Sequence, residues 1–210
     1  MAGGTTDPGK PELSRTAQRT KNAVMESALA LFKERGFDSV TIEEITQRAG
    51  VAKGSFYTYF PTKSDIIVEE FRKIDAFYLY WADGNLRRYK TAKEKLSAFT
   101  RAQMKYVRDV VGNHSLRILY ANQVIQPGTG KIITAEDRHW VRIVARIIAE
   151  GQAAGEFRAD LDASRLAVLF NRSARAVLLD WCIRNAEFDL VKEGVFFMKD
   201  WIMRALEKEE

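Results

Sequence analysis

The sequence has few of the residues that form covalent cross-links or bind metals. Cys182 is the single cysteine among 210 residues, so no disulfide can form within the chain, and this usage suits a reducing compartment. The two histidines, His114 and His139, lie far apart and have no cysteine or carboxylate cluster at ligand spacing. We therefore expect neither a metal ion nor a cofactor.

Long apolar runs are also absent. None approaches the roughly 20 residues that a membrane-spanning helix needs, and the N-terminal residues lack the apolar core of a signal peptide. We expect a cytoplasmic protein with no membrane partner. No stretch alternates apolar and polar residues for long enough to indicate a sheet, and the fold class that we predict is all-α.

The polar residues give little support to catalysis. No nucleophile–base arrangement, carboxylate pair or metal cluster occurs at a useful spacing, so we do not expect an enzyme. The net charge of +5 permits a polyanionic partner. Its distribution weakens that argument, since residues 1–65 hold nine basic and eight acidic side chains, whereas residues 72–117 hold eleven and four.

A helix-turn-helix pattern occupies residues 41–60. Thr41 and Glu44 have the spacing of a capping box, which starts a helix, and Gly50 supplies the permissive backbone that ends it abruptly. Phe56 and Phe60, four residues apart, can anchor a short second helix inward. The other side chains of that helix then face outward.

The outward face suits a nucleic acid, because lysine, hydroxyl and tyrosine groups reach phosphates and base edges. A surface helical hairpin without a partner is the alternative. Basic residues at the start of the first helix form either a solvated tail or an arm that contacts phosphates. We predict DNA contacts by Arg19, Thr41, Lys53, Gly54, Ser55, Tyr57, Thr58, Tyr59 and Lys63, the last placed for a phosphate.

The pattern TxxEIxxxAGVxKGSFYxYFxxKxxI resembles the DNA-binding segment of the TetR (tetracycline-repressor) family of bacterial transcription regulators. The likeness extends upstream through Ala28 to Phe32 and Arg35 to Phe37. One departure is Ala52, where many members carry a capping hydroxyl. The start of the chain, rich in Gly, Thr and Pro, predicts a disordered leader (1–17). The resemblance implies a helix-turn-helix DNA-binding domain (18–78) and a helical ligand-binding and dimerisation domain (79–210).

Apolar spacing predicts the remaining architecture. A stripe that begins at Val24 predicts a first helix, which packs with the two helices of the motif in a small core. Capping signals at Thr62/Asp65 begin a long connecting helix that ends near Asp83. Thr91/Glu94, Thr134/Asp137, Asp162 and Asp189 predict further starts, giving helices near 91–111, 115–126, 134–154, 162–186 and 189–207.

Aromatic residues are frequent in the middle helices, where core packing explains most of them. The family resemblance implies a ligand pocket between the connecting helix and the three that follow, for an apolar or aromatic effector. Its candidate residues are Tyr78, Trp81, Phe99, Gln103, Tyr106, Tyr120, Asn122, Gln123, His139 and Trp140. The basic stripe of Arg101, Lys105 and Arg108 is either a solvated face or a site for an anionic ligand such as an acyl-CoA.

The last two helices carry large apolar faces. The resemblance implies that they pair with their counterparts in a four-helix dimer interface, formed by Phe170, Ala174, Val177, Leu178, Trp181, Phe197 and Trp201. We predict a homodimeric repressor that binds a near-palindromic operator and releases it when a small molecule binds. A TetR-like activator and a helical protein-interaction module, both without small-molecule induction, are the alternatives.

Overall fold

A computed structural model describes residues 14–125 and 132–208. Helices account for the regular structure in these ranges, and the β-type pairing there is one isolated bridge between Phe157 and Glu207. The all-α prediction is confirmed. Most of the predicted leader lies outside the described residues. Within the described ranges, no helix is long and apolar enough to cross a membrane.

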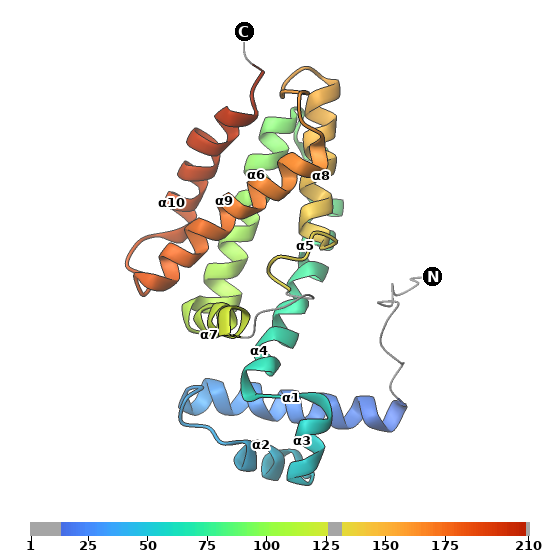
Figure 1. Cartoon of the computed structure of the whole chain (residues 1–210), viewed down its shortest axis with the longest axis vertical. Coiled ribbons are helices and arrows are strands. Elements are labelled where there is room, and N and C mark those ends of the chain that lie inside the picture. Colours follow the sequence, from blue (N-terminus) through green and yellow to red (C-terminus); the bar gives the residue numbers. More distant parts are fainter. Residues whose placement is uncertain (1–13, 126–131, 209–210) are drawn as a thin grey trace. The chain divides into compact units, whose positions relative to one another are not determined.

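The chain divides into two compact units, one up to Ile66 and the other from Ile67. The first unit contains α1 (Arg15–Arg35), α2 (Ile42–Ala49), α3 (Lys53–Tyr59) and the first residues of α4 (Lys63–Arg72), as Figure 1 shows.

Local signals set the ends of these helices. The Thr41 hydroxyl accepts the N–H of Glu44, and the Glu44 carboxylate accepts the N–H of Thr41, so the predicted capping box is present. Gly50 ends α2 in the left-handed conformation, at φ 68°. Ala52 precedes α3 without a side-chain cap, as the missing hydroxyl predicts.

The apolar positions predicted for the small core are mostly confirmed. Side chains of α1, α2 and α3 form one buried cluster, with others half-buried against it. Its buried members are Val24, Met25, Ala28, Leu31, Val40, Ile45, Phe56, Phe60 and Ile66. Burial of Phe56 and Phe60 holds α3, which is too short to be stable alone.

The second unit contains only helices and their connections in the described residues. They are the rest of α4, α5 (Ile74–Asn85), η1 (Leu86–Arg88), α6 (Ala92–Tyr106), η2 (Val107–Val111), α7 (Gly112–Ile125), α8 (His139–Ala153), α9 (Ala163–Ile183), α10 (Leu190–Phe196), η3 (Phe197–Ile202) and η4 (Met203–Leu206). η2 and η3 are π-helical turns that continue α6 and α10. The predicted caps at Thr91, Asp162 and Asp189 are confirmed.

The single connecting helix predicted over residues 63–83 is wrong, because the chain forms two helices there, α4 and α5. Between them the N–H of Lys73 bonds to the carbonyl of Glu70, three residues back. This tighter turn interrupts the four-residue ladder.

The helix predicted from Thr134 is also wrong, since α8 begins at His139. Arg138 precedes it with an extended backbone, ψ 144°. Its guanidinium forms two hydrogen bonds with the Asp75 carboxylate and lies over the Phe71 ring. This long-range pairing fixes the start of α8 and overrides the local capping signal.

Aromatic rings connect the helices of the second unit. Phe99 of α6 contacts Tyr78 and Trp81 of α5, and it stacks on Trp140 of α8. Trp140 in turn stacks on Phe170 of α9. The core of this unit is therefore a continuous series of rings.

Candidate DNA-binding surface and effector site

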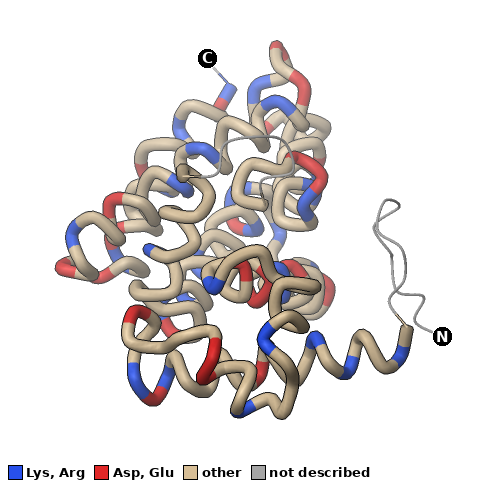
Figure 2. Tube along the Cα trace, turned by 60° about the horizontal axis from the view of Figure 1, so that its bottom comes forward, with Lys and Arg blue, Asp and Glu red and all other residues tan. Residues whose placement is uncertain are grey.

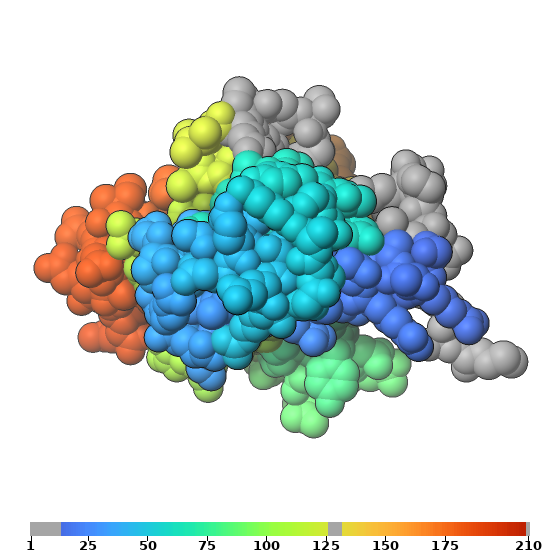
Figure 3. All heavy atoms as spheres, turned by 90° about the horizontal axis from the view of Figure 1, so that it is seen from below, coloured from blue at the N-terminus to red at the C-terminus, as the bar shows by residue number. Residues whose placement is uncertain are grey.

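The second helix of the motif, α3, presents its polar residues outward. Phe56 is fully buried, whereas Lys53, Gly54, Tyr57 and Thr58 are exposed. Ser55 and Tyr59, also predicted to contact DNA, are half-buried. Figure 3 shows α2 and α3 forming a continuous surface, coloured from light blue to cyan.

The Thr41 side chain is engaged within the protein. Its hydroxyl donates to the Glu44 carboxylate at 2.9 Å, and Arg35 reaches the other oxygen of that group at 2.7 Å. The backbone N–H of Thr41, followed by Arg35 and the Thr41 hydroxyl, lowers the pKa of Glu44 to about 2. Glu44 is thus ionised at neutral pH and holds the start of α2.

Lys53, at the first turn of α3, forms an ion pair with Glu43 of α2. Hydrogen bonding between them raises the pKa of Lys53 and lowers that of Glu43. Both groups are more than half exposed. Lys53 is therefore fully charged, and it can leave the Glu43 carboxylate to pair with a DNA phosphate.

Lys63 is directed into the first unit. Its ammonium donates to the carbonyl oxygens of Phe37, at 2.5 Å, and Val40, at 2.7 Å, and lies 4.3 Å from the Phe37 ring centroid. Burial lowers its pKa from the ordinary value. This bonding is an internal role that the sequence did not predict, and it engages the ammonium that the sequence predicted for a phosphate.

The N-terminal half of α1 carries only positive charge. Arg15 and Arg19 are exposed, and the first turn contains no acidic residue. Figure 2 shows this as a run of basic positions along α1. Lys21 lies 5.9 Å from the Phe60 ring centroid. If the start of α1 contacts DNA phosphates, the exposed Arg15 and Arg19 are the residues placed to do so.

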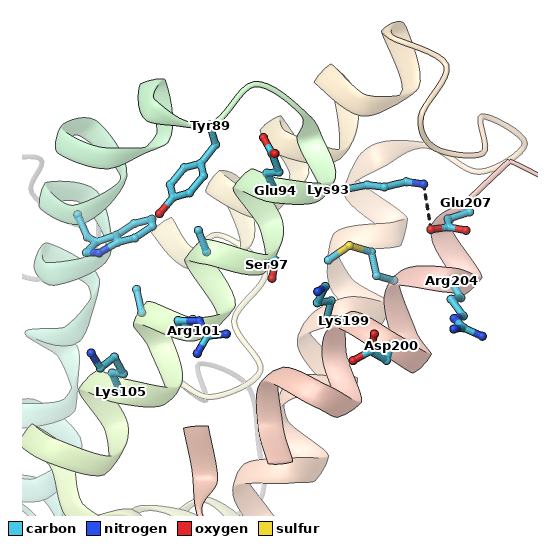
Figure 4. Close-up of a pocket in the computed structure, with 14 residues that line it drawn as sticks. Tyr89, Lys93, Glu94, Ser97, Arg101, Lys105, Lys199, Asp200, Arg204 and Glu207 are labelled. Atoms are coloured by element: carbon cyan, nitrogen blue, oxygen red, sulfur yellow. Dashed lines mark ion pairs between the residues drawn. The ribbon is translucent and has the colours of Figure 1, made fainter. Parts of the chain in front are cut away.

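In the second unit, a large groove lies between α6 and the C-terminal segment η3–η4. Its volume is about 710 Å³. Arg101 and Lys105 of the basic stripe line it, opposite Lys199 and Arg204 (Figure 4). The remaining lining residues are Trp81, Tyr89, Lys93, Glu94, Ser97, Ala98, Ala102, Asp200, Met203 and Glu207.

A small inner cavity, of about 30 Å³, lies within the same unit. Tyr78, Gln103, Tyr120 and Trp140, all predicted for the ligand pocket, line it together. The other lining residues are Phe71, Val107, Leu116, Leu119, Ile133, Arg138, Asn171, Arg175 and Leu178.

The other predicted pocket residues lie outside this cavity. Trp81 lines the groove, and Phe99 lies between the two sites through its contacts with Trp81 and Tyr78. Tyr106 stacks on Phe77 at 4.1 Å. Asn122 and Gln123 bond to one another, and His139 is the first residue of α8.

Sequence reasoning did not identify several charged residues of these sites. Lys199 and Arg204 meet Arg101 only through tertiary packing, and Arg138 and Arg175 reach the inner cavity in the same way. No local motif marks such residues. The available signal was that polar residues interrupt the apolar spacing of the C-terminal helices.

The residues predicted for the dimer interface fall into two groups. Phe170, Ala174, Leu178 and Trp181 are buried within the chain itself. Trp201 is 66% exposed, and Val177 and Phe197 line a groove between α9 and α10. Further exposed apolar side chains on these helices are Leu169, Leu179, Ile183 and Phe196.

Known proteins share both units. Residues 24–69 match the family model described as bacterial regulatory proteins, tetR family, and residues 83–198 match the C-terminal region of YsiA-like protein. The fatty acid metabolism regulator protein of Bacillus subtilis is 24% identical over 174 residues, 80% of this chain and 86% of that protein. The transcriptional repressor KstR2 of Mycolicibacterium smegmatis is 26% identical over 172 residues, 80% and 81% of the two chains.

Solved structures share the fold. FadR of Thermus thermophilus, a TetR-family repressor in complex with lauroyl-CoA, gives a TM-score of 0.74 at 19% identity, covering 90% of this chain and 96% of that one. FadR of Bacillus subtilis in complex with stearoyl-CoA gives 0.66 at 22%, covering 89% and 99%.

The chain belongs to the TetR family of bacterial transcription regulators. It is a DNA-binding transcriptional repressor that responds to a small-molecule ligand.

Proposed function

We propose that the ligand that releases this repressor from its operator is a fatty acyl-CoA thioester. The observation that carries the proposal is the large basic groove between α6 and η3–η4. In this account the groove binds the phosphate-bearing head, and the acyl tail enters the aromatic core.

The groove has an excess of positive charge that is not neutralised internally. Five cationic side chains line it, against the carboxylates of Glu94, Asp200 and Glu207. Lys93 pairs with Glu207 at 2.9 Å. In the described ranges no carboxylate lies within ion-pairing distance of Arg101, Lys105, Lys199 or Arg204, so these groups are available to a polyanion.

The groove also offers an apolar route inward. Trp81 and Tyr89 line the groove, and aromatic rings are groups on which a nucleobase can stack. The Trp81 ring lies 5.7 Å from Phe99, which lies 5.6 Å from Tyr78 at the inner cavity. Two ring contacts thus separate the groove from the cavity, and a tail that displaces these rings stays in apolar surroundings.

The relatives support the same ligand class. One is named a fatty acid metabolism regulator, and two structures of similar fold contain lauroyl-CoA and stearoyl-CoA. A ligand with both an anionic head and an apolar tail also accounts for a basic groove beside an aromatic core. An effector that is only apolar leaves the four unpaired cations without a role.

On the DNA side, we propose that Lys53, Gly54, Ser55, Tyr57, Thr58 and Tyr59 contact the operator, with Arg19 and Thr41 beside them. Among these, we assign Lys53, at the start of α3, to a contact with a base edge. We assign Arg19 to a contact with a phosphate. We propose that the protein acts in the cytoplasm, because the operator DNA is located there.

A gel shift with the upstream region of its own gene tests the function. Lauroyl-CoA at micromolar concentration should abolish the shift, whereas free CoA and laurate should not, because each lacks one half of the recognised molecule. The double variant Arg101→Ala/Lys105→Ala should need at least tenfold more lauroyl-CoA. Arg146→Ala, an exposed arginine of α8 outside the groove, is the matched control. Release by laurate alone would refute the assignment of the groove.

A further inference from the structure

The inner cavity holds polar atoms that have no partner in the protein. Gln103 and Trp140 both line it and are only 6% and 2% exposed. The Gln103 Oε1 and the Trp140 Nε1 are both fully buried and without a hydrogen bond. Most buried polar groups in proteins are bonded, so an acceptor and a donor left open at one cavity indicate a missing partner.

The remaining polar wall includes Arg138, Arg175 and Tyr78. Arg175 donates to the Ile133 carbonyl at 3.1 Å, and among the described residues no carboxylate pairs with it. Arg138 is neutralised by Asp75. Burial raises the pKa of Tyr78 and outweighs the opposing effects of Arg138 and of a hydrogen bond from the Gln103 side chain, so its phenol stays protonated at neutral pH.

The size and chemistry of the cavity define what fits. About 30 Å³ is room for one oxygen-sized group. A hydroxyl group carries both the acceptor that the Trp140 N–H lacks and the donor that the Gln103 oxygen lacks. A methyl group leaves both atoms unbonded, and a carboxylate oxygen cannot donate to Gln103.

The backbone beside the cavity is unusual in the same place. Val107, the first residue of the π-helical turn η2, lines the cavity four positions after Gln103. Single π-helical turns occur frequently at functional sites. The π-helical turn follows directly after the helical turn that carries Gln103, so the regular hydrogen-bond pattern of α6 ends beside the cavity.

We propose that the inner cavity binds a hydroxyl group on the acyl tail, so that the preferred effector is a hydroxylated acyl thioester and not a plain alkyl one. The proposal rests on the effector class proposed above. In the free protein a water molecule suits the same donor and acceptor, and the hydroxyl of the tail replaces it with equivalent bonds.

Calorimetry on the full chain tests the proposal. The probes are dodecanoyl-CoA and its derivatives with one hydroxyl at carbon 3, 6, 9 or 12, since the depth of the tail is not fixed beforehand. At least one derivative should bind tenfold or more tightly than dodecanoyl-CoA. A site built to bond a hydroxyl discriminates strongly against an analogue that lacks it.

Two variants locate the effect. Gln103→Leu removes the open acceptor, and Trp140→Phe removes the open donor while it keeps a ring. Each should reduce the preference for the hydroxylated probe to less than threefold. Thr100→Val is the matched control, because Thr100 has a buried hydroxyl without a partner on the same helix but does not line the cavity.

The outcomes separate the two proposals. Equal binding of hydroxylated and plain probes, or a preference that persists in both variants, would overturn the hydroxyl site and leave the acyl-CoA assignment intact. If no CoA thioester binds, the effector class and the hydroxyl site are both refuted. Thermal melting shows whether each variant is folded. Trp140→Phe also removes part of a buried, stacked ring, so its melting temperature should fall somewhat even though the chain still folds.

Discussion

The ammonium of Lys63 lies 2.7 Å from the carbonyl oxygen of Val40, and this bond ties the first turn of α4 to the loop that precedes α2. The same ammonium bonds to Phe37 in that loop. Because α4 continues into the second unit, we expect a movement of α4 to reach the start of α2 through Lys63. A ligand that binds the second unit can change operator affinity only if it binds one conformation of the protein more tightly than another.

Substitution of Lys63 tests this tie. Lys63→Ala should weaken binding to all DNA sequences alike and lower the free energy of unfolding by about 1.5–3 kcal/mol, the range for a hydrogen bond to a charged group. Its internal bonds predict an unchanged slope of log affinity against log salt. A slope flatter by about 0.9 would show instead that Lys63 contacts a phosphate. Lys63→Arg, which keeps the charge, should retain most of the affinity.

The ion pair between Glu43 and Lys53 should restrain DNA binding. Glu43→Gln frees Lys53 and removes a carboxylate from the surface that meets phosphates, so operator affinity should rise several-fold and the salt slope should steepen by up to about 0.9. Fluorescence anisotropy at several salt concentrations measures both. Asp160→Asn, which breaks an exposed ion pair in the second unit, is the control and should leave both values unchanged.

The start of α2 should be sensitive to acid. The pKa of Glu44 is lowered to about 2, from an ordinary value of 4.5, by its bonds to Thr41 and Arg35. Its stabilising contribution is therefore complete above pH 4.5 and is lost as the pH falls towards 2. Carbon NMR of the Glu44 carboxyl should show a midpoint near 2. A midpoint near 4.5 would mean that the capping box does not hold this carboxylate.

Exposed apolar residues of α9 should form the dimer contact, since the predicted positions on that helix such as Trp181 are largely buried within the chain. Leu179→Glu combined with Ile183→Glu should give a monomer in sedimentation velocity and abolish tight operator binding. A dimer must place its recognition helices about 34–36 Å apart, or a multiple of this, to enter successive major grooves.

Tyr80→Glu, another exposed apolar position, is the control and should leave the dimer intact. A Leu179/Ile183 double variant that stays dimeric would place the interface elsewhere.

Local signals made much of the fold predictable. The capping boxes at Thr41 and Thr91 act over three residues, and the apolar stripes set which face of each helix is buried. The start of α8 was mispredicted because Arg138 pairs with Asp75, 63 residues away, and no local pattern encodes that pairing.

The site was predictable only in part for the same reason. Arg101 and Lys105 form a recognisable stripe on one helix, but Lys199 joins them through tertiary packing. Tyr78, Gln103 and Trp140 were predicted for one pocket by family resemblance, and their side chains do line one cavity. The open donor and acceptor there depend on the packing of every neighbour, which a sequence pattern does not contain.

Acyl-CoA binding in the second unit and operator binding in the first should be thermodynamically coupled. Calorimetric titration of lauroyl-CoA into the dimer, with and without saturating operator, measures this coupling. If lauroyl-CoA weakens operator affinity about 100-fold, operator must weaken lauroyl-CoA affinity by the same factor, a coupling of about 2.7 kcal/mol. Equal affinity for lauroyl-CoA in the two titrations would contradict the account.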